Sequence, residues 1–236
     1  MTRVIAFIPA RAGSQRIQRK NLAEVGGVPL VARAVRTGLG AETRVVVSSD
    51  SASVLSAADA AVSGRVWAHR RAREHAGPHA QIEDAIQHWV SRELRGFPLS
   101  PRDVIVLLQP TSPFRRVETV RECIRLVRDE GYDSALTITL AFRRNGRVRS
   151  HEDGTPRVIW NAPDPLWRPR SQDVRPEGYE NGAVYAFTVE HFRRTRCRMG
   201  GREACVPISQ WEAFEIDTPE DLDVARLIAP MFEGAE

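Results

Sequence analysis

Short apolar runs alternate with amphipathic segments along most of this chain, and that alternation limits the possible folds more than any other feature. The continuous apolar runs Val4–Ile8, Val45–Val47 and Val104–Leu108 are typical of buried parallel strands. The segments that begin at Pro29 and Ile82 carry apolar residues at helical spacing, which favours helices. Strands that alternate with helices in this way predict an α/β fold with a doubly wound, mostly parallel sheet.

The alternation stops between residues 141 and 180. Prolines, glycines and arginines crowd this segment of about 40 residues, which is long for a plain loop. The pattern resumes at Ala183–Phe187, and a last helix begins with Thr218 as its cap and Pro219 at its first position. We therefore expect one α/β domain made of residues 1–140 and 181–236, with residues 141–180 inserted as an oligomerisation arm or small subdomain.

The expected sheet also indicates where a ligand would bind. Ligands of doubly wound sheets lie at the carboxyl ends of the strands. The loops that follow Ile8, Val47, Leu108 and Phe187 are therefore the expected positions of a site.

The first of these loops, residues 9–21, has the residue types of a polyphosphate site. Gly13 allows close backbone approach and Ser14 offers a hydroxyl, while backbone N–H groups add donors. Positive charge comes from Arg11, Arg16 and Lys20. The loop lacks the ending of a Walker loop and the glycine spacing of a dinucleotide fingerprint, so a basic surface loop is the alternative.

Lys20 stands out because every other one of the 34 basic residues is an arginine. Lysine is a compact, mobile point charge, whereas arginine is a planar fork. A chain that uses arginine almost everywhere places its one lysine in its most motif-like loop. That position favours a functional role for Lys20, with chance as the alternative.

Two further segments carry polar side chains suited to a ligand. Gln109 begins a Gln-Pro-Thr-Ser-Pro turn at the end of a strand and would present a neutral amide, although a plain polar turn explains this segment equally well. Glu215 and Asp217 are two residues apart, so on an extended segment both carboxylates lie on the same side. Two hard oxygen ligands beside a phosphate loop suit Mg²⁺ bound jointly with substrate phosphates. The alternative is that these acids favour the start of the helix that follows.

Composition excludes several classes of protein. With 42% hydrophobic and 27% charged residues the chain is an ordinary globular protein, and no apolar run approaches the about 18 residues of a membrane span. The net charge of +4 arises from interspersed charges without stacking aromatics, so nucleic acid is not an expected partner. The three cysteines form no Cys-x-x-Cys pair, which favours reduced thiols in a cytoplasmic protein. His75 and His79 have the spacing of helical metal ligands, but the Gly-Pro between them should break the helix.

The motifs together resemble those of the acylneuraminate (CMP-sialic acid synthetase) cytidylyltransferase family. The resemblance covers residues from about 3 to 228 and rests on the Arg-x-x-Ser…Lys-Asn loop, the Leu-Leu-Gln-Pro-Thr-Ser-Pro turn, the Asn-Gly-Ala-Val-Tyr segment that begins at Asn181, and Glu215–Thr218. Related enzymes that activate 3-deoxy-octulosonate carry Gln-Gly-Asp-Glu-Pro at the turn, which argues against that branch. The resemblance implies a fold of the nucleotidyltransferase type. It also implies Mg²⁺-dependent transfer of CMP from CTP to a hydroxyl-bearing acid, and a homodimer whose arm reaches the partner's site.

The resemblance also implies roles for individual residues. The catalytic residues would be Arg11, Lys20, Gln109 and Asp217. The nucleotide-binding residues would be Arg11, Gly13, Ser14, Lys20, Asn21, Arg71 and Ala80. The substrate-binding residues would be Gln109, Arg170, Gln172, Asn181 and Tyr185, and the Mg²⁺ ligands Glu215 and Asp217. The chain departs from the family before the third helix, where a Gly-Pro-His-Ala-Gln-Ile stretch lacks the hydroxyl that reads cytosine.

The leading expectation is a cytidylyltransferase for a nonulosonic acid of the sialic, legionaminic or pseudaminic type. An alternative within the class is another acid acceptor, such as a small phosphonate, because an arginine-rich arm would serve a dianion as readily as a carboxylate. An alternative from another class is a non-catalytic nucleotide-binding or RNA-binding relative that has kept the fold.

Overall fold

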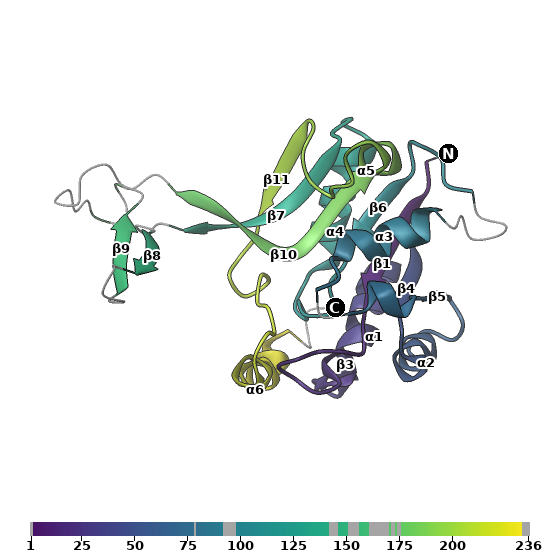
Figure 1. The fold of residues 1–236 in the computed structure, drawn as a ribbon, viewed down its shortest axis with the longest axis horizontal. Coiled ribbons are helices and arrows are strands. Elements are labelled where there is room, and N and C mark those ends of the chain that lie inside the picture. The colour runs from purple at the N-terminus through teal and green to yellow at the C-terminus, as the bar shows by residue number, and fades with distance from the viewer. Residues whose placement is uncertain are drawn as a thin grey trace.

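The computed structural model describes residues 2–77, 79–91, 98–141, 146–150, 156–160, 170, 173 and 176–232. Its central sheet has seven strands in the order β11-β7-β10-β6-β1-β4-β5 (Figure 1). The strands are β1 (Val4–Pro9), β4 (Arg44–Ser49), β5 (Val66–Arg70), β6 (Val104–Leu107), β7 (Ser134–Ala141), β10 (Glu177–Thr188) and β11 (Glu203–Pro207). Every strand of this sheet except β10 runs in the direction of β1, which confirms the expected mostly parallel α/β fold.

Helices cover both faces of the sheet, as expected for a doubly wound fold. They are α1 (Leu30–Gly40), α2 (Ala52–Ala60), α3 (Ile82–Ser91), α4 (Val117–Arg128), α5 (Val189–Thr195) and α6 (Pro219–Ile228). Ala6 and Val47 pack with α1, α2 and α4 on one face, whereas Phe7 and Val46 pack with α3 and α5 on the other. Successive strand residues point to opposite faces, so the continuous apolar runs fill both layers.

β10 is reversed because the chain leaves the sheet after β7 and returns beside it. Its pairing with both β6 and β7 is antiparallel. The expectation of a ligand loop after Phe187 is therefore wrong: Thr188 pairs with Val104, the first residue of β6, at the edge opposite the carboxyl ends of the parallel strands. The part of β10 near Gly182 lies at the ligand edge instead, where Gly182 takes a φ of 74° within an irregularity of the pairing.

Residues 141–180 contain regular structure that the sequence pattern did not indicate. β8 (Gly146–Ser150) and β9 (Pro156–Trp160) form an antiparallel pair that lies apart from the main sheet, beyond the far ends of β7 and β10 (Figure 1). β7 continues to Ala141 and β10 begins at Glu177, so the ends of the segment belong to strands of the main sheet. The division into a domain and a dimerisation arm stays a prediction.

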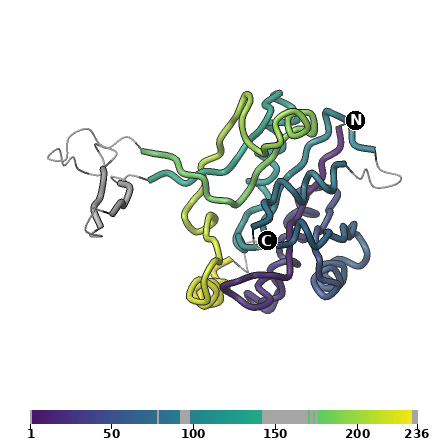
Figure 2. Tube along the Cα trace, in the orientation of Figure 1, coloured from purple at the N-terminus to yellow at the C-terminus, as the bar shows by residue number. Residues whose placement is uncertain are grey.

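A third apolar cluster holds the loop after β1 against the last helix. Ile17 from that loop, Ile216 and Leu222 are buried in this cluster together with Phe114, which follows the turn after β6. The ring of Phe114 stacks on Phe232 with the centroids 4.3 Å apart. Figure 2 shows the N-terminal loop, in purple, beside the C-terminal helix, in yellow. The three motif segments are thus brought together by a core of their own.

The connecting segments follow local signals. The short hairpin β2 (Glu24–Val25) and β3 (Val28–Pro29) leads from the first loop into α1. Thr218 caps α6 in a complete capping box with Asp221, as predicted. No helix among the described residues is both long and apolar enough to cross a bilayer. Cys123, Cys197 and Cys205 carry free thiols.

Candidate active site

A cavity of about 270 Å³ lies where β1 and β6 end, at the carboxyl edge of the parallel strands. Its wall comes from four stretches of chain: the loop after β1, the segment between β5 and α3, the turn after β6, and the segment before α6. The predicted site residues on this wall are Arg11, Ser14, Lys20, Asn21, Arg71, Ala80, Gln109, Glu215 and Asp217. The structure thus brings the expected phosphate loop, acidic pair and Gln109 turn to one place.

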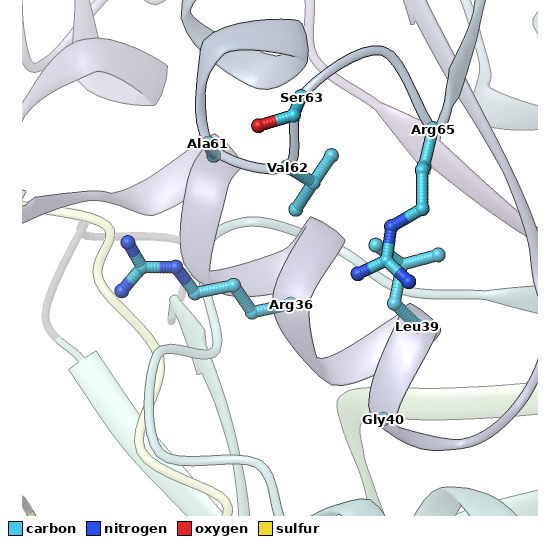
Figure 3. A pocket seen from close by; sticks show the side chains of 7 residues that line it. All are labelled: Arg36, Leu39, Gly40, Ala61, Val62, Ser63 and Arg65. Atoms are coloured by element: carbon cyan, nitrogen blue, oxygen red, sulfur yellow. The ribbon is translucent and has the colours of Figure 1, made fainter.

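A larger hollow of about 570 Å³ lies between the end of α1 and the turn that follows α2 (Figure 3). None of its lining residues belongs to a predicted motif. Figure 3 shows the guanidinium groups of Arg36 and Arg65 pointing in different directions, so they do not converge on one ligand position. The smaller cavity, which gathers the motif side chains, is the better candidate for a site.

The loop after β1 is held in place by its own polar groups and by neighbouring segments. The Asn21 amide is buried and donates to the Arg11 carbonyl over 2.8 Å, so it fixes the loop. The Arg11 guanidinium donates to the Gly77 carbonyl over 2.6 Å, and the Ala12 N–H donates to Asp50 over 2.8 Å. Arg11 therefore joins the loop after β1 to the segment before α3.

Lys20 connects the loop to the acidic segment. Its Nζ donates to the Ile216 carbonyl over 2.9 Å and lies 3.2 Å from Asp217 Oδ1. Arg16 Nη2 lies 3.3 Å from the same oxygen. The Lys20 side chain is 14% exposed, whereas that of Asp217 is 40% exposed. Two cations from the loop thus share one carboxylate whose other side faces solvent.

Glu215 lies beside Asp217 but in a different environment. Its carboxylate accepts a hydrogen bond from the Thr111 hydroxyl over 3.3 Å. Loss of water around the carboxyl raises the pKa of Glu215, and the negative charge of Asp217 raises it further. A bound cation would relieve this repulsion. Among the described residues no group of three or more His, Cys, Asp or Glu is placed to hold a metal.

Arg71 also lines the cavity. Its Nε donates to Ser48 Oγ over 3.1 Å and its Nη2 to the Ser48 carbonyl over 3.0 Å. Burial lowers the pKa of Arg71 to about 10, an effect opposed by the charge of Asp50 and reinforced by that of Arg11. Arg71 remains a cation at neutral pH, held at the cavity by two hydrogen bonds to one residue.

The turn after β6 places Gln109 against β10. Gln109 Nε2 donates to the Gly182 carbonyl over 3.2 Å. A Cβ on Gly182 would come within 3.3 Å of Gln109 Nε2 and 3.7 Å of the Glu215 oxygens. The buried Arg115 guanidinium donates to the Gln109 carbonyl from behind. Burial lowers the pKa of Arg115 to about 9, against the charge of Glu212.

Thr111 and Gly182 were missed as individual site residues by sequence reasoning. Thr111 contacts Glu215 through its hydroxyl, and its carbonyl accepts the Ile216 N–H over 2.8 Å. The available signal for Gly182 is the Asn-Gly pair inside a strand, which indicates a bulge.

Two residues predicted to bind substrate use their polar groups in hydrogen bonds within the protein. Asn181 is buried, accepts from the Thr137 hydroxyl over 2.7 Å and donates to Thr139 over 3.0 Å. Tyr185 donates its hydroxyl to Glu180, and the Arg198 guanidinium lies 4.5 Å from the centre of its ring. Burial raises the pKa of Tyr185, and the bond to Glu180 raises it further. Neither side chain lies on the cavity wall.

The remaining predicted residues lie away from the cavity or outside the described residues. Arg170 is exposed and pairs with Asp173 over 2.7 Å. Gln172 lies outside the described residues. Gly13 does not line the cavity, and an added Cβ there would meet no heavy atom within 4 Å. The roles of these residues stay predictions.

Comparison with known proteins places the chain among enzymes of one type. An N-acylneuraminate cytidylyltransferase A from Danio rerio is 29% identical over 229 residues, covering 94% of this chain and 50% of that protein. A 3-deoxy-manno-octulosonate cytidylyltransferase from Anaeromyxobacter sp. (strain Fw109-5) is 28% identical and covers 97% of both chains. The chain spans about half the length of several N-acylneuraminate cytidylyltransferases that it matches.

The fold and the family model agree with these relatives. The solved structure of a CMP:2-keto-3-deoxy-manno-octonic acid synthetase complexed with CTP has a TM-score of 0.67 at 17% identity, over 98% of this chain and 99% of that one. This likeness shows a nucleotidyltransferase fold. The model of the cytidylyltransferase family matches residues 5–154, more than half of the sequence. The chain therefore belongs to the cytidylyltransferase family.

Proposed function

We propose that this protein transfers CMP from CTP to a hydroxyl of an acidic sugar and releases pyrophosphate. The proposed acceptor is a nonulosonic acid of the sialic, legionaminic or pseudaminic type. The observation that carries the proposal is the meeting of Lys20 and Arg16 with Asp217 in a cavity that Gln109 also lines. A cluster of cations beside carboxylates and an amide has the groups that a nucleoside triphosphate, a metal ion and a sugar require.

In this proposal the loop after β1 binds the triphosphate. Arg11, Ser14 and Lys20 face the cavity and provide two positive charges and a hydroxyl. The acceptor hydroxyl attacks the α-phosphorus and the bond to pyrophosphate breaks. Positioning and neutralisation of charge dominate such a transfer, since little covalent chemistry falls to the protein. Lys20 and Arg16 would exchange Asp217 for phosphate oxygens when CTP binds.

We also propose that Glu215 and Asp217 hold Mg²⁺ jointly with the phosphates. Burial raises the pKa of Glu215 and the charge of Asp217 raises it further, and a divalent cation would suit such a pair of carboxylates. The cation supplies neutralisation of charge on the transferring phosphate and on the pyrophosphate. The chain's own part is to hold the two carboxylates on one wall, through the Thr111 hydroxyl at Glu215 and, until CTP binds, through the Lys20 ammonium at Asp217.

The acceptor is assigned to the side of the cavity formed by Gln109. The Gln109 amide donates to the carbonyl of Gly182 in the bulge of β10. Gly182 lies near the Glu215 carboxylate as well. Arg170 from that segment would bind the acceptor carboxylate, in the site of a partner subunit of a homodimer. The named relatives support an acidic sugar acceptor, and the Gln-Pro-Thr-Ser-Pro turn supports the nonulosonic branch.

The experiment is pyrophosphate release from CTP and Mg²⁺ with a panel of acids, with the product identified by mass spectrometry. The panel contains sialic, legionaminic and pseudaminic acids, 3-deoxy-octulosonate and a small aminoalkyl phosphonate. A CMP conjugate of one of the first three supports the proposal. A conjugate of the octulosonate or the phosphonate alone keeps cytidylyl transfer and replaces the acceptor. Absence of CTP binding, measured by calorimetry, contradicts the enzymatic assignment.

A further inference from the structure

A chain of buried polar side chains lies behind Arg71. Ser48 of β4 and His69 of β5 are register partners on adjacent parallel strands, so their side chains lie on the same face of the sheet. His69 Nδ1 lies 2.9 Å from Ser48 Oγ, and His69 Nε2 lies 3.0 Å from Nδ1 of His88 on α3. Ser48, His69 and His88 are all buried. None of them belongs to a predicted site motif.

The donor at Arg71 fixes the direction of the first of these hydrogen bonds. A guanidinium only donates, so Arg71 Nε gives its proton to Ser48 Oγ. The Ser48 hydroxyl then has one proton to donate, and His69 Nδ1 is its hydrogen-bonding neighbour among the described side chains. A neutral His69 that accepts at Nδ1 carries its proton on Nε2, which donates to His88 Nδ1. With His69 in this tautomer each group donates to the next, from Arg71 through Ser48 and His69 to His88, whereas the other tautomer would donate from Nδ1 to Ser48 Oγ.

The hydrogen bonds among Ser48, His69 and His88 restrain the Arg71 guanidinium at the cavity. Among the described residues, both hydrogen bonds of the Arg71 guanidinium end on Ser48, one on the hydroxyl and one on the carbonyl. The carbonyl is fixed by β4, but the hydroxyl can rotate unless another group orients it. His69 orients it by accepting its proton, and α3 fixes His69 through His88. The position of Arg71 on the cavity wall therefore depends on buried residues that do not themselves line the cavity.

The charges around Arg71 make this restraint necessary. Arg71 is buried beside the like charge of Arg11, while Asp50 is the nearby opposite charge that acts on it. A long cationic side chain that is buried beside a like charge is better solvated when its charged end moves toward water. The hydrogen bonds to Ser48 oppose that movement.

From this geometry we infer that His69 is a positioning residue for nucleotide binding, acting through Ser48 on the Arg71 guanidinium. The inference rests on the proposed function, since it takes CTP as the ligand of the cavity. His69 does not itself line the cavity. It sets the orientation in which Arg71 meets the nucleotide.

The first test is the dissociation constant of CTP for two His69 variants, measured by calorimetry. His69→Phe removes the acceptor for the Ser48 proton and should weaken CTP binding about tenfold, the scale of one lost hydrogen bond to a charged network. His69→Asn keeps an acceptor near the position of Nδ1 and should stay within about threefold of the wild type. Equal binding by wild type and His69→Phe would overturn the positioning role.

His191→Phe is the matched control. His191 is also buried and lies on α5, where its Nε2–H donates to the Met199 carbonyl over 3.1 Å, away from the cavity. The same substitution there should lower the melting temperature without changing the dissociation constant of CTP. A comparable loss of binding in His191→Phe would mean that His69→Phe acts through stability alone, which contradicts the inference.

A second test asks whether His69 acts through Arg71. If it does, His69→Phe added to Arg71→Ala should weaken CTP binding no further than Arg71→Ala alone. A further tenfold loss in the double variant would contradict the inference. Failure of the wild type to bind CTP is a separate outcome, because it removes the proposed function as well.

A third test needs no variant and no nucleotide. In the wild-type protein labelled with ¹⁵N-histidine, the long-range proton–nitrogen spectrum should show His69 protonated at Nε2 and unprotonated at Nδ1. A proton on Nδ1 would reverse the bond to Ser48 and overturn the chain of donors.

Discussion

The Nζ of Lys20 lies 3.2 Å from Asp217 Oδ1, so the one lysine of the chain pairs with one member of the acidic pair. The same Nζ donates to the carbonyl of Ile216. Two motifs that the sequence separates by almost the whole domain therefore meet through a single side chain. Binding of a triphosphate and a cation would require both partners to change ligands together.

Lys20→Arg is expected to reduce turnover more than CTP binding. Arginine keeps the charge but is longer and planar, so its charge cannot occupy the position of the Lys20 Nζ between Asp217 and the Ile216 carbonyl. We expect kcat to fall about tenfold or more, because small misplacements of reacting groups lower the rate of transfer. Lys20→Ala should impair both kcat and CTP binding. Steady-state kinetics at saturating Mg²⁺ measure both, with Arg36→Ala as a control on the unrelated hollow; full turnover by Lys20→Arg would show that the lysine has no special role.

Asp217→Asn should keep the fold and lower turnover by about 100-fold or more, the scale of one lost preorganised charge contact. The matched control is Asp223→Asn on α6, whose side chain is 72% exposed and pairs only locally with Arg226. That variant should turn over at the wild-type rate. Wild-type turnover that persists in EDTA would contradict the assignment of the acidic pair to Mg²⁺.

A mixture of Arg170→Ala and Lys20→Ala proteins should recover activity that neither variant has alone. Mixed dimers would contain one site with an intact Lys20 and an intact Arg170 from the partner. Subunit exchange is verified first by native mass spectrometry of the mixture. If exchange occurs and no activity returns, each site is built from a single chain.

The stability of the domain should depend on pH through Asp103. Burial by itself would raise the pKa of Asp103, but hydrogen bonds from Arg3 and Ser100 outweigh it and lower the pKa below 3.8. A lowered pKa stabilises the folded state above pH 3.8, and this contribution disappears as the pH falls through the folded-state pKa. Asp103→Asn should therefore cost about 2 kcal/mol at pH 7.

Urea unfolding measures this free energy, with the exposed Asp59→Asn as the control. The difference between wild type and Asp103→Asn should stay constant from pH 7 to about pH 5 and shrink below pH 3.8. A difference that is already lost at pH 6 would assign the effect to another group.

Sequence reasoning predicts the features that depend on local signals. The apolar run Val4–Ile8 and the cap at Thr218 each need only a few neighbouring residues, and both are confirmed. The reversal of β10 was missed because apolar periodicity carries no strand direction. The pair β8 and β9 was missed because arginines, prolines and glycines hide any alternation there.

The same limit applies to the candidate site. Spacing and residue types predict a phosphate loop and an acidic pair, and residues of both line one cavity. Thr111, which contacts Glu215, lies in the Gln-Pro-Thr-Ser-Pro turn without being singled out there, and His69, which stands behind Arg71, belongs to no motif. Their positions follow from strand register and from the packing of α3, which no short sequence window contains.

The most direct test of the account is pyrophosphate release by the wild-type protein with CTP, Mg²⁺ and a nonulosonic acid, compared with the same assay using UTP, ATP or GTP. We predict release from CTP alone, with one CMP conjugate formed for each pyrophosphate and no release in EDTA. Absence of pyrophosphate with every acid, together with no calorimetric binding of CTP, would contradict the assignment of this cavity to cytidylyl transfer.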